Sequence, residues 1–173
     1  MKLQLSFIGS QQRWGDVQAL ANLGYCYFYG RACEKNYDLA FAYFKMAAYQ
    51  RNVDALYKLS NMYASGIGVE KDEDIADYYL RAALDELNGL PVQVAKEYPS
   101  VFYSAAKSSL KSKSKNVNLE NVYELLKFAK EGYEMMIAQG DKYYEKMLME
   151  VIDILHQKRF QPYWDEEDVP IIN

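Results

Sequence analysis

Two stretches of the sequence decide the fold: residues 19–30 read ALANLGYCYFYG, and residues 55–66 read ALYKLSNMYASG. The second stretch repeats the first at a shift of 36 residues, with alanine, leucine, tyrosine and glycine at matching positions. The match continues through the next segment, where Asp38, Ala40, Tyr43 and Ala47 correspond to Asp74, Ala76, Tyr79 and Ala83. So many matches in one register indicate an internal structural repeat.

Each 36-residue unit predicts two helices. Leu20, Leu23, Gly24 and Tyr27 recur with the spacing of one helical face, as do Ala40, Tyr43, Phe44 and Ala47. Asp16 and Asn52 precede the first helices as N-caps, and Gly30 and Gly66 end them. The small residues allow close helix packing. Tyr27 and Tyr63 are expected to fill the space between units, where truncation to alanine costs ~3–5 kcal/mol.

The pattern Ala-x-x-x-Leu-Gly-x-x-Tyr-x-x-Gly, followed by Asp-x-x-x-Ala-x-x-Tyr-Phe-x-x-Ala-Ala, resembles the Sel-one-like (Sel1-like) repeat, a relative of the tetratricopeptide repeat. Gly66-Ile67-Gly68-Val69 matches the interhelical turn of that family, whereas Gly30-Arg31-Ala32-Cys33 lacks the second glycine. The resemblance implies an all-α fold, an alpha-alpha superhelix built as a short right-handed solenoid of antiparallel helix pairs. It also implies a non-catalytic role in assembly or signalling, often in bacteria.

The repeats divide the chain. We predict a single helical-repeat domain over residues 1–160 and an acidic C-terminal tail over residues 160–173. Within the domain the predicted segments are an N-terminal half-repeat or cap (1–14), repeat one (15–50), repeat two (51–87), a diverged third repeat with an insertion (91–138) and a capping helix (140–158). Residues 122–129 match residues 40–47 at a shift of 82, and Gly140-Asp141 opens the capping helix.

The N-terminus has two interpretations. Leu3, Phe7 and Ile8 align with Leu39, Tyr43 and Phe44, which favours a helix, whereas the alternation of apolar and polar residues over 2–7 favours a strand. We favour the helix, because a repeat needs its first face covered.

Composition excludes several classes of protein. The 173 residues carry a net charge of −4, and a non-specific nucleic-acid binder needs a basic excess. No segment reaches the length of about 18–20 apolar residues that spans a bilayer, and no signal peptide is apparent, so we expect a cytoplasmic protein with no membrane partner. One basic tract, Lys107–Lys115, is predicted to be a solvated loop; the alternative is a patch for an acidic protein or nucleic acid.

From the residue types and their spacing we predict no catalytic residue, no metal site and no cofactor. His156 is the single histidine, and we expect it at a helix end or on the surface. Cys26 and Cys33 occupy the repeat positions of Met62 and Val69, as small hydrophobic residues would. Gly66-x-Gly68 follows a helix and precedes no Gly-Lys-Ser/Thr, which excludes a phosphate loop. The charges of residues 70–74 are typical of a solvated helix cap.

The expected function is that of an adaptor, a monomer or weak homodimer, that binds a protein or peptide on the concave face of the solenoid. First helices usually line that face, and their unpacked positions are Gln18, Asn22, Tyr25, Tyr29, Asp54, Lys58, Asn61 and Ser65. Tyr143, Met147 and Glu150 of the closing helix could extend the set. Polar groups with scattered tyrosines suit protein recognition.

The alternative is a small acidic inhibitor, phage or host encoded, that covers a basic or nucleic-acid-binding surface of a partner enzyme. Its contact would be Asp165, Glu166, Glu167 and Asp168. Tyr163 and Trp164 would then anchor the tail on the partner or on the solenoid itself, and a mobile terminus is the remaining possibility.

Overall fold

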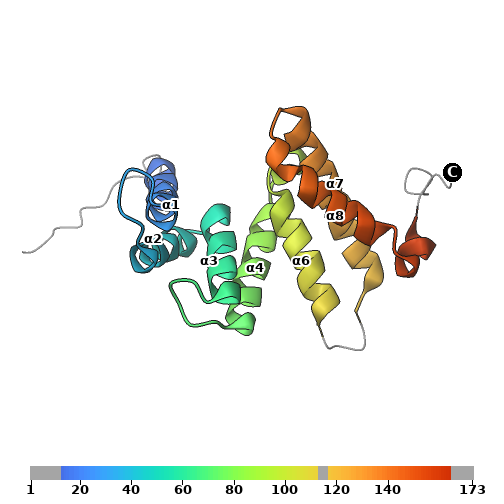
Figure 1. Ribbon diagram of the computed structural model, residues 1–173, viewed down its shortest axis with the longest axis horizontal. Helices are drawn as coiled ribbons and strands as arrows, with labels where there is room; N and C mark the ends of the chain where they lie inside the picture. Colours follow the sequence, from blue (N-terminus) through green and yellow to red (C-terminus); the bar gives the residue numbers. More distant parts are fainter. Residues whose placement is uncertain (1–12, 113–116, 165–173) are drawn as a thin grey trace, which may run out of the picture. The chain divides into compact units, whose positions relative to one another are not determined.

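A computed structural model describes residues 13–112 and 117–164, and over these residues it contains helices and turns but no strand (Figure 1). The predicted all-α fold is therefore confirmed. The chain divides into two compact units, Met1–Glu86 and Leu87–Asn173. The helix-or-strand alternative for the N-terminus and the acidic residues Asp165–Asp168 both lie outside the described residues.

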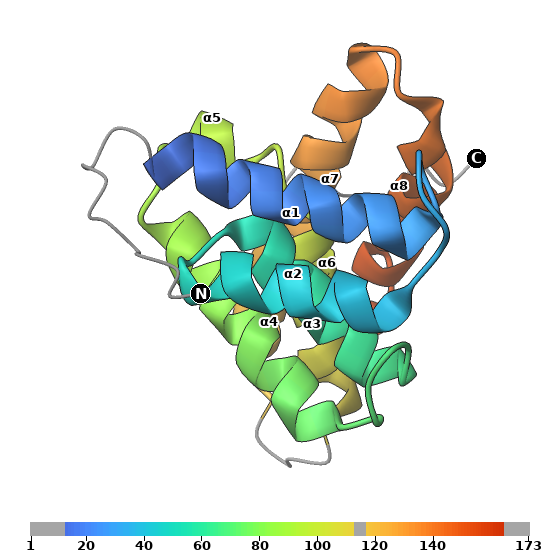
Figure 2. The same ribbon diagram turned by 90° about the vertical axis from the view of Figure 1, so that its left-hand side faces the viewer.

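The first unit is built from two helix pairs. Helix α1 (Arg13–Tyr29) pairs with α2 (Tyr37–Tyr49), and α3 (Val53–Ser65) pairs with α4 (Glu73–Asn88), whose last two residues belong to the second unit. Figure 2 shows α1 lying along α2. Each 36-residue unit therefore supplies one pair, as the repeat predicts.

Three of the four predicted capping residues mark a helix boundary in the structure. Asn52 caps α3, because its side chain accepts a hydrogen bond from the Ala55 amide at 2.9 Å. Gly30 and Gly66 follow the first helices with positive φ angles of 70° and 68°. The prediction for Asp16 is wrong: α1 begins at Arg13, so Asp16 lies within the first turn of the helix instead of before it.

Small residues set the distance between paired helices. A Cβ atom added to Gly24 would lie 2.6 Å from the Phe44 ring, so only glycine permits this approach of α1 to α2. The four predicted alanines, Ala40, Ala47, Ala76 and Ala83, are all buried. These small residues therefore have the packing role that the repeat predicts.

The two repeat tyrosines are less buried than expected. Tyr27 stacks on Tyr43 with ring centroids 5.6 Å apart, and Tyr63 stacks on Tyr79 at 5.7 Å, so each helix pair contains one parallel tyrosine pair. Tyr27 and Tyr63 are nevertheless only half-buried. Because part of each ring already meets solvent, we expect the cost of truncation to fall below the range for a fully buried aromatic residue.

The turn between the paired helices takes the same backbone form in both repeats. Gly68 has a φ of +69°, and a Cβ atom there would lie 2.7 Å from the Tyr37 Cβ atom of α2. Ala32 stands at the matching position of the first repeat and has a φ of +61°. The first turn therefore keeps the left-handed backbone without the glycine that normally supports it.

The second unit consists of α5 (Val92–Ala95), α6 (Pro99–Lys111), α7 (Leu119–Ala138), η1 (Lys142–Tyr144), α8 (Glu145–Leu155) and η2 (Lys158–Tyr163). Helices α6 and α7 pack together, and α8 packs on α7. Val122, Leu126 and Ala129 are buried at the positions that match Ala40, Phe44 and Ala47, so the burial pattern agrees with the alignment at a shift of 82.

The predicted lysine loop is wrong in its first half. Lys107–Lys111 forms the last turn of α6, and the Lys107 ammonium lies 4.8 Å from the centre of the Tyr103 ring. Lysine is a good helix former, and positive charge is favourable at a helix C-terminus. Lys113 and Lys115 lie outside the described residues.

Candidate protein-binding surface

The eight predicted binding residues lie on the two first helices of the first unit: Gln18, Asn22, Tyr25 and Tyr29 on α1, and Asp54, Lys58, Asn61 and Ser65 on α3. We call this set the stripe. All eight side chains are exposed or half-exposed. The helical spacing places four of them along one side of each helix.

Direct contacts join the two halves of the stripe. The Gln18 side chain donates to Asn22 at 3.3 Å and accepts from the Asn52 amide group at 3.4 Å. The Lys58 ammonium donates to the Tyr29 hydroxyl at 3.0 Å. Asn52 caps α3 and Lys58 lies within α3, so both hydrogen bonds link α1 to the second repeat. The stripe is therefore one surface that crosses the repeat boundary.

Lys58 lies at the centre of an aromatic cluster. Its ammonium nitrogen is 4.5 Å from the Phe28 ring centre, 5.0 Å from that of Tyr29 and 5.2 Å from that of Tyr25. Distances below about 6 Å allow cation–π attraction. The rings therefore hold the lysine in place and leave it half-exposed, as a fixed positive charge on the stripe.

Asp54 supplies a carboxylate one helical turn before Lys58. Burial raises the pKa of the Asp54 carboxyl, and the positive charge of Lys58 opposes this shift. The stripe thus carries one charge of each sign, and neutral amides and tyrosines make up most of the rest.

Two residues outside the predicted stripe contribute to this surface. Phe28 gives the shortest contact to Lys58, and Asn52 bonds to Gln18 while it caps α3. Sequence reasoning assigned Asn52 to capping alone and assigned Phe28 no role. Tyr25, by contrast, meets the core: its ring packs edge-on against Phe44 at 5.2 Å.

In the part of the chain that the structure describes, histidine, cysteine and acidic side chains form no metal-binding cluster. His156 caps the C-terminus of α8 and is exposed, as predicted. Cys26 and Cys33 are free thiols that are half-exposed.

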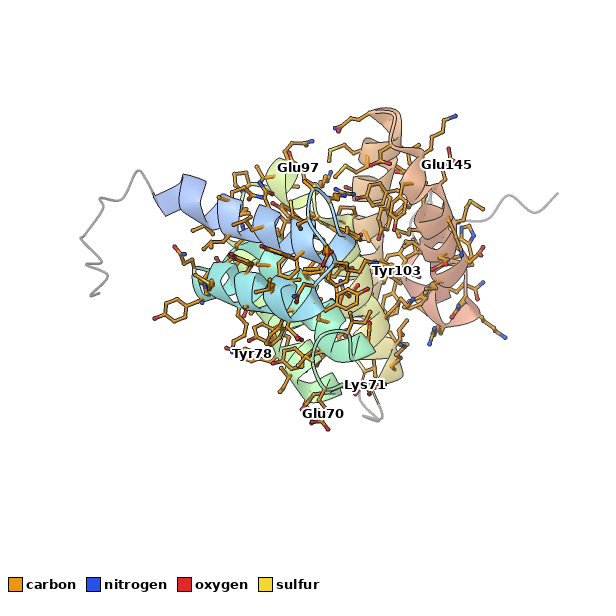
Figure 3. The ribbon with its side chains drawn as sticks, turned by 60° about the vertical axis from the view of Figure 1, so that its left-hand side comes forward. Glu70, Lys71, Tyr78, Glu97, Tyr103 and Glu145 are labelled. Carbon is orange, nitrogen blue, oxygen red and sulfur yellow. The ribbon has the colours of Figure 1, made fainter. Side chains whose placement is uncertain are left out.

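The charged run before α4 is a helix cap. Asp72 accepts from the Ile75 amide at 2.9 Å, and Lys71 pairs with Glu73 at 2.9 Å. Glu70 and Lys71 lie at the tip of the turn (Figure 3). These contacts give the charges a structural role.

The first residues of the predicted tail are not extended. Phe160 is fully buried in η2, Tyr163 lies 6.0 Å from Tyr123 between ring centres, and the Trp164 indole donates to the Leu155 carbonyl at 2.9 Å. Tyr163 and Trp164 therefore pack on their own chain, within the second unit.

The predicted additions from the closing helix lie in the second unit. Tyr143 is strongly exposed, and Met147 is half-exposed. Glu150 accepts a hydrogen bond from the Tyr103 hydroxyl at 2.7 Å, which joins α8 to α6. Glu150 therefore has a structural partner within its unit.

The family model for the Sel1 repeat matches residues 17–52 and 53–86. These 70 of the 173 residues form two Sel1 repeats. The matched segments coincide with the α1–α2 and α3–α4 pairs. Sel1 repeats generally serve as scaffolds for protein–protein interaction and are typically non-catalytic.

Similar proteins support the family and the fold. An uncharacterized Sel1-like repeat-containing protein of Schizosaccharomyces pombe is 33% identical over 100 residues, which cover 54% of this chain and 14% of that protein. A Sel1 repeat protein from Oxalobacter formigenes has a TM-score of 0.58 at 19% identity, covering 72% of this chain and 47% of the other. A protective antigen present in uropathogenic Escherichia coli strains, which displays an SLR fold, has a TM-score of 0.55 at 24% identity, covering 83% of this chain and 31% of the other.

The chain thus spans less than half the length of each of these relatives. Within the described ranges, no helix of this Sel1-like protein combines the length and apolar character needed to cross a bilayer.

Proposed function

We propose that this Sel1-like protein is a non-catalytic cytoplasmic adaptor, a monomer or weak homodimer, that binds a protein or peptide through the stripe on the concave side of its repeats. The observation that carries the proposal is the pair of contacts across the repeat boundary, Asn52 to Gln18 and Lys58 to Tyr29. They fix polar and aromatic groups of two repeats in one accessible surface. Such a surface loses little side-chain freedom on binding, which favours affinity.

The chemistry of the stripe favours a partner with mixed polar and apolar side chains. Its amides offer donors and acceptors, and Tyr29 offers an exposed ring of the type that dominates binding energy at interfaces. Lys58 and Asp54 each present one charge, so the partner needs matching charges at only one or two positions.

The structure indicates which substitutions test the stripe without unfolding it. Tyr25 contacts the core residue Phe44, so its truncation would change both stability and binding. Tyr29 and Asn61 are better choices, because Tyr29 is about half exposed (48%) at the last residue of α1 and Asn61 is half-exposed on α3. Tyr49 on α2 is 91% exposed and outside the stripe, which makes Tyr49→Ala a matched control.

The test begins with affinity purification from the native cell, followed by titration calorimetry with the purified partner. We expect Tyr29→Ala/Asn61→Ala to weaken binding at least tenfold, which corresponds to about 1.4 kcal/mol. Tyr49→Ala should leave the dissociation constant within a factor of two. Equal effects of the double variant and the control would contradict the proposal.

The second candidate is the acidic inhibitor, and one observation favours it: Trp164 is anchored, so the acidic run starts directly beyond a fixed point. A chain truncated after Trp164 removes Asp165–Asp168 and keeps the buried Phe160. Three results together would favour the inhibitor over the adaptor. The truncation would abolish binding, the Tyr29→Ala/Asn61→Ala variant would still bind, and the affinity would fall steeply as the salt concentration rises.

A further inference from the structure

Two positive charges meet at one aromatic ring at the end of α1. The Arg31 guanidinium carbon lies 5.1 Å from the centre of the Tyr29 ring, and the Lys58 ammonium nitrogen lies 5.0 Å from the same centre. The two charges are therefore separated by no more than the Debye length of about 10 Å in 0.1 M salt, so they act together on an anion beside the ring. Arg31 follows α1 and Lys58 belongs to α3, so they come from different repeats. We call Arg31, Tyr29 and Lys58 the two-cation site.

Both cations are available to an anion from another molecule. In the ranges 13–112 and 117–164, neither Arg31 nor Lys58 forms an ion pair with a carboxylate. Asp54 attracts Lys58 from one helical turn away, but burial outweighs this attraction and raises the pKa of the Asp54 carboxyl. Within the described ranges, the chain therefore provides no direct anionic partner for the two-cation site, although its net charge is −4.

Aromatic contacts fix the two charges without neutralising them. Lys58 donates to the Tyr29 hydroxyl at 3.0 Å and lies 4.5 Å from the centre of the Phe28 ring. A cation beside an aromatic ring keeps its full charge, because the attraction comes from the quadrupole of the ring. Charges that are already held in place lose less side-chain freedom when they bind an anion, which favours affinity.

The second repeat forms the same helix end without this site. Tyr29 is the last residue of α1, and its counterpart Ser65 is the last residue of α3. The counterpart of Arg31 is Ile67. Since the second repeat ends its first helix with neither a ring nor a guanidinium at these positions, the repeat fold does not require them, and we infer a role other than packing.

We propose that the two-cation site binds one anionic side chain, carrying a carboxylate or a phosphate group, of the protein or peptide that the stripe takes as its partner. This inference rests on the proposed function and adds the chemical class of the group that anchors the partner. The guanidinium fork of Arg31 binds carboxylate or phosphate oxygens with paired hydrogen bonds, and the Lys58 ammonium adds a second charge. The half-exposed Tyr29 ring offers apolar surface to the stem of the same side chain.

Blocked tripeptides test the anion before the partner is identified. Acetyl-Ala-Glu-Ala-amide and its glutamine and phosphoserine forms are titrated at constant ionic strength into the full ¹⁵N-labelled chain. The backbone amide of Gly30, between Tyr29 and Arg31, reports binding by nuclear magnetic resonance. We expect the glutamate peptide to bind at least tenfold more tightly than the glutamine peptide, because the glutamine side chain carries no charge.

Substitutions then assign the binding to the two cations. Arg31→Gln/Lys58→Gln should weaken the glutamate peptide at least tenfold. Arg31→Gln alone should weaken it at least threefold, and this exposed turn position leaves the contacts of Lys58 with the rings in place. The matched control Lys45→Gln removes a lysine that lies 5.6 Å from the Phe41 ring centre on α2, and it should change the affinity by less than twofold.

The source of the anion follows from the third peptide. Tighter binding of the phosphoserine peptide than of the glutamate peptide would assign the anchor to a phosphorylated residue, and equal or weaker binding would assign it to a carboxylate. Equal binding of the glutamate and glutamine peptides would overturn the proposal. Equal losses in Arg31→Gln and Lys45→Gln would overturn it too, since the attraction would then be diffuse.

The test of the stripe stays separate. If Tyr29→Ala/Asn61→Ala leaves binding of the purified partner intact, the proposed function fails whichever peptide binds. If that variant weakens partner binding and Arg31→Gln/Lys58→Gln does not, the anionic anchor alone is wrong.

Discussion

The turn after α1 makes a sharp prediction: replacing Ala32 with glycine should stabilise the protein. Ala32 has a φ of +61°, a left-handed backbone that costs a residue with a Cβ atom about 1–2 kcal/mol. Glycine removes that cost but adds about 0.4–1 kcal/mol through the greater freedom of the unfolded chain. The net gain in the free energy of unfolding is therefore about 0.8 kcal/mol.

The matching substitution in the second repeat should have the opposite sign. Gly68→Ala introduces the same backbone strain and also a Cβ atom 2.7 Å from the Tyr37 Cβ and 2.9 Å from its carbonyl oxygen. Overpacking of this kind costs ~1–3 kcal/mol in addition to the strain. In the first repeat, the position that matches Tyr37 is Met1, which lies outside the described residues. The close contact that requires glycine is therefore established for the second turn.

Urea unfolding followed by circular dichroism at constant slope measures both effects. A gain of about 0.8 kcal/mol moves the midpoint upward by roughly 0.3–0.8 M at the slopes of small domains. The control is Ala42→Gly, at an exposed position within α2, which should lower stability by about 1 kcal/mol through helix propensity alone. If Ala32→Gly lowers the midpoint as Ala42→Gly does, Ala32 does not hold a left-handed backbone and the reasoning is refuted.

Three further outcomes can be measured on the same material. Tyr27→Ala and Tyr63→Ala should each lower the free energy of unfolding in urea by about 2 kcal/mol, because each loses a stacked ring that is half exposed. A loss above 4 kcal/mol would show that the rings are buried. Burial and the hydrogen bond to Glu150 raise the pKa of Tyr103, so the folded chain keeps a proton that the unfolded chain releases near pH 10. The free energy of unfolding should therefore fall as the pH rises above about 10. Tyr103→Phe should flatten this fall, and an unchanged pH profile would exclude Tyr103 as its source. Gly132→Ala should destabilise the second unit by ~1–3 kcal/mol, because the new Cβ atom would lie 2.6 Å from a backbone carbonyl oxygen; unfolding at the wild-type midpoint would contradict that contact.

The parts of the fold that could be predicted from sequence are those that the repeat duplicates. A shift of 36 residues gives every packing position a second copy, so the alanines on α2 and α4 identify each other. Burial at these positions depends on local helix pairing, which a periodic pattern encodes directly. The same holds for the glycines after α1 and α3, whose positive φ angles end both helices.

The parts that could not be predicted lack such a copy or depend on distant contacts. Gly132 of α7 approaches the carbonyl of Lys96, a contact across 36 residues of unrelated sequence. The residues after α8 look like a tail because prolines and acids dominate, yet Phe160 is buried against the unit. In that case one aromatic side chain with a docking site outweighs the composition around it, since burying it removes a large apolar area from water.

The stripe shows how far a surface can be derived from a repeat. The helical period places its eight residues correctly on the exposed sides of α1 and α3, because positions that do not pack are set by those that do. The period says nothing about which side chains on adjacent helices bond to each other. The aromatic cluster joins Phe28 and Tyr29 of the first repeat to Lys58 of the second. The repeat counterparts of Phe28 and Tyr29 are Ala64 and Ser65, so the second repeat carries no equivalent rings at these positions. On the proposed function, a partner bound to the stripe would meet a surface that differs between the repeats. We therefore expect the non-repeated residues to set specificity, while the repeated ones hold the helices in place.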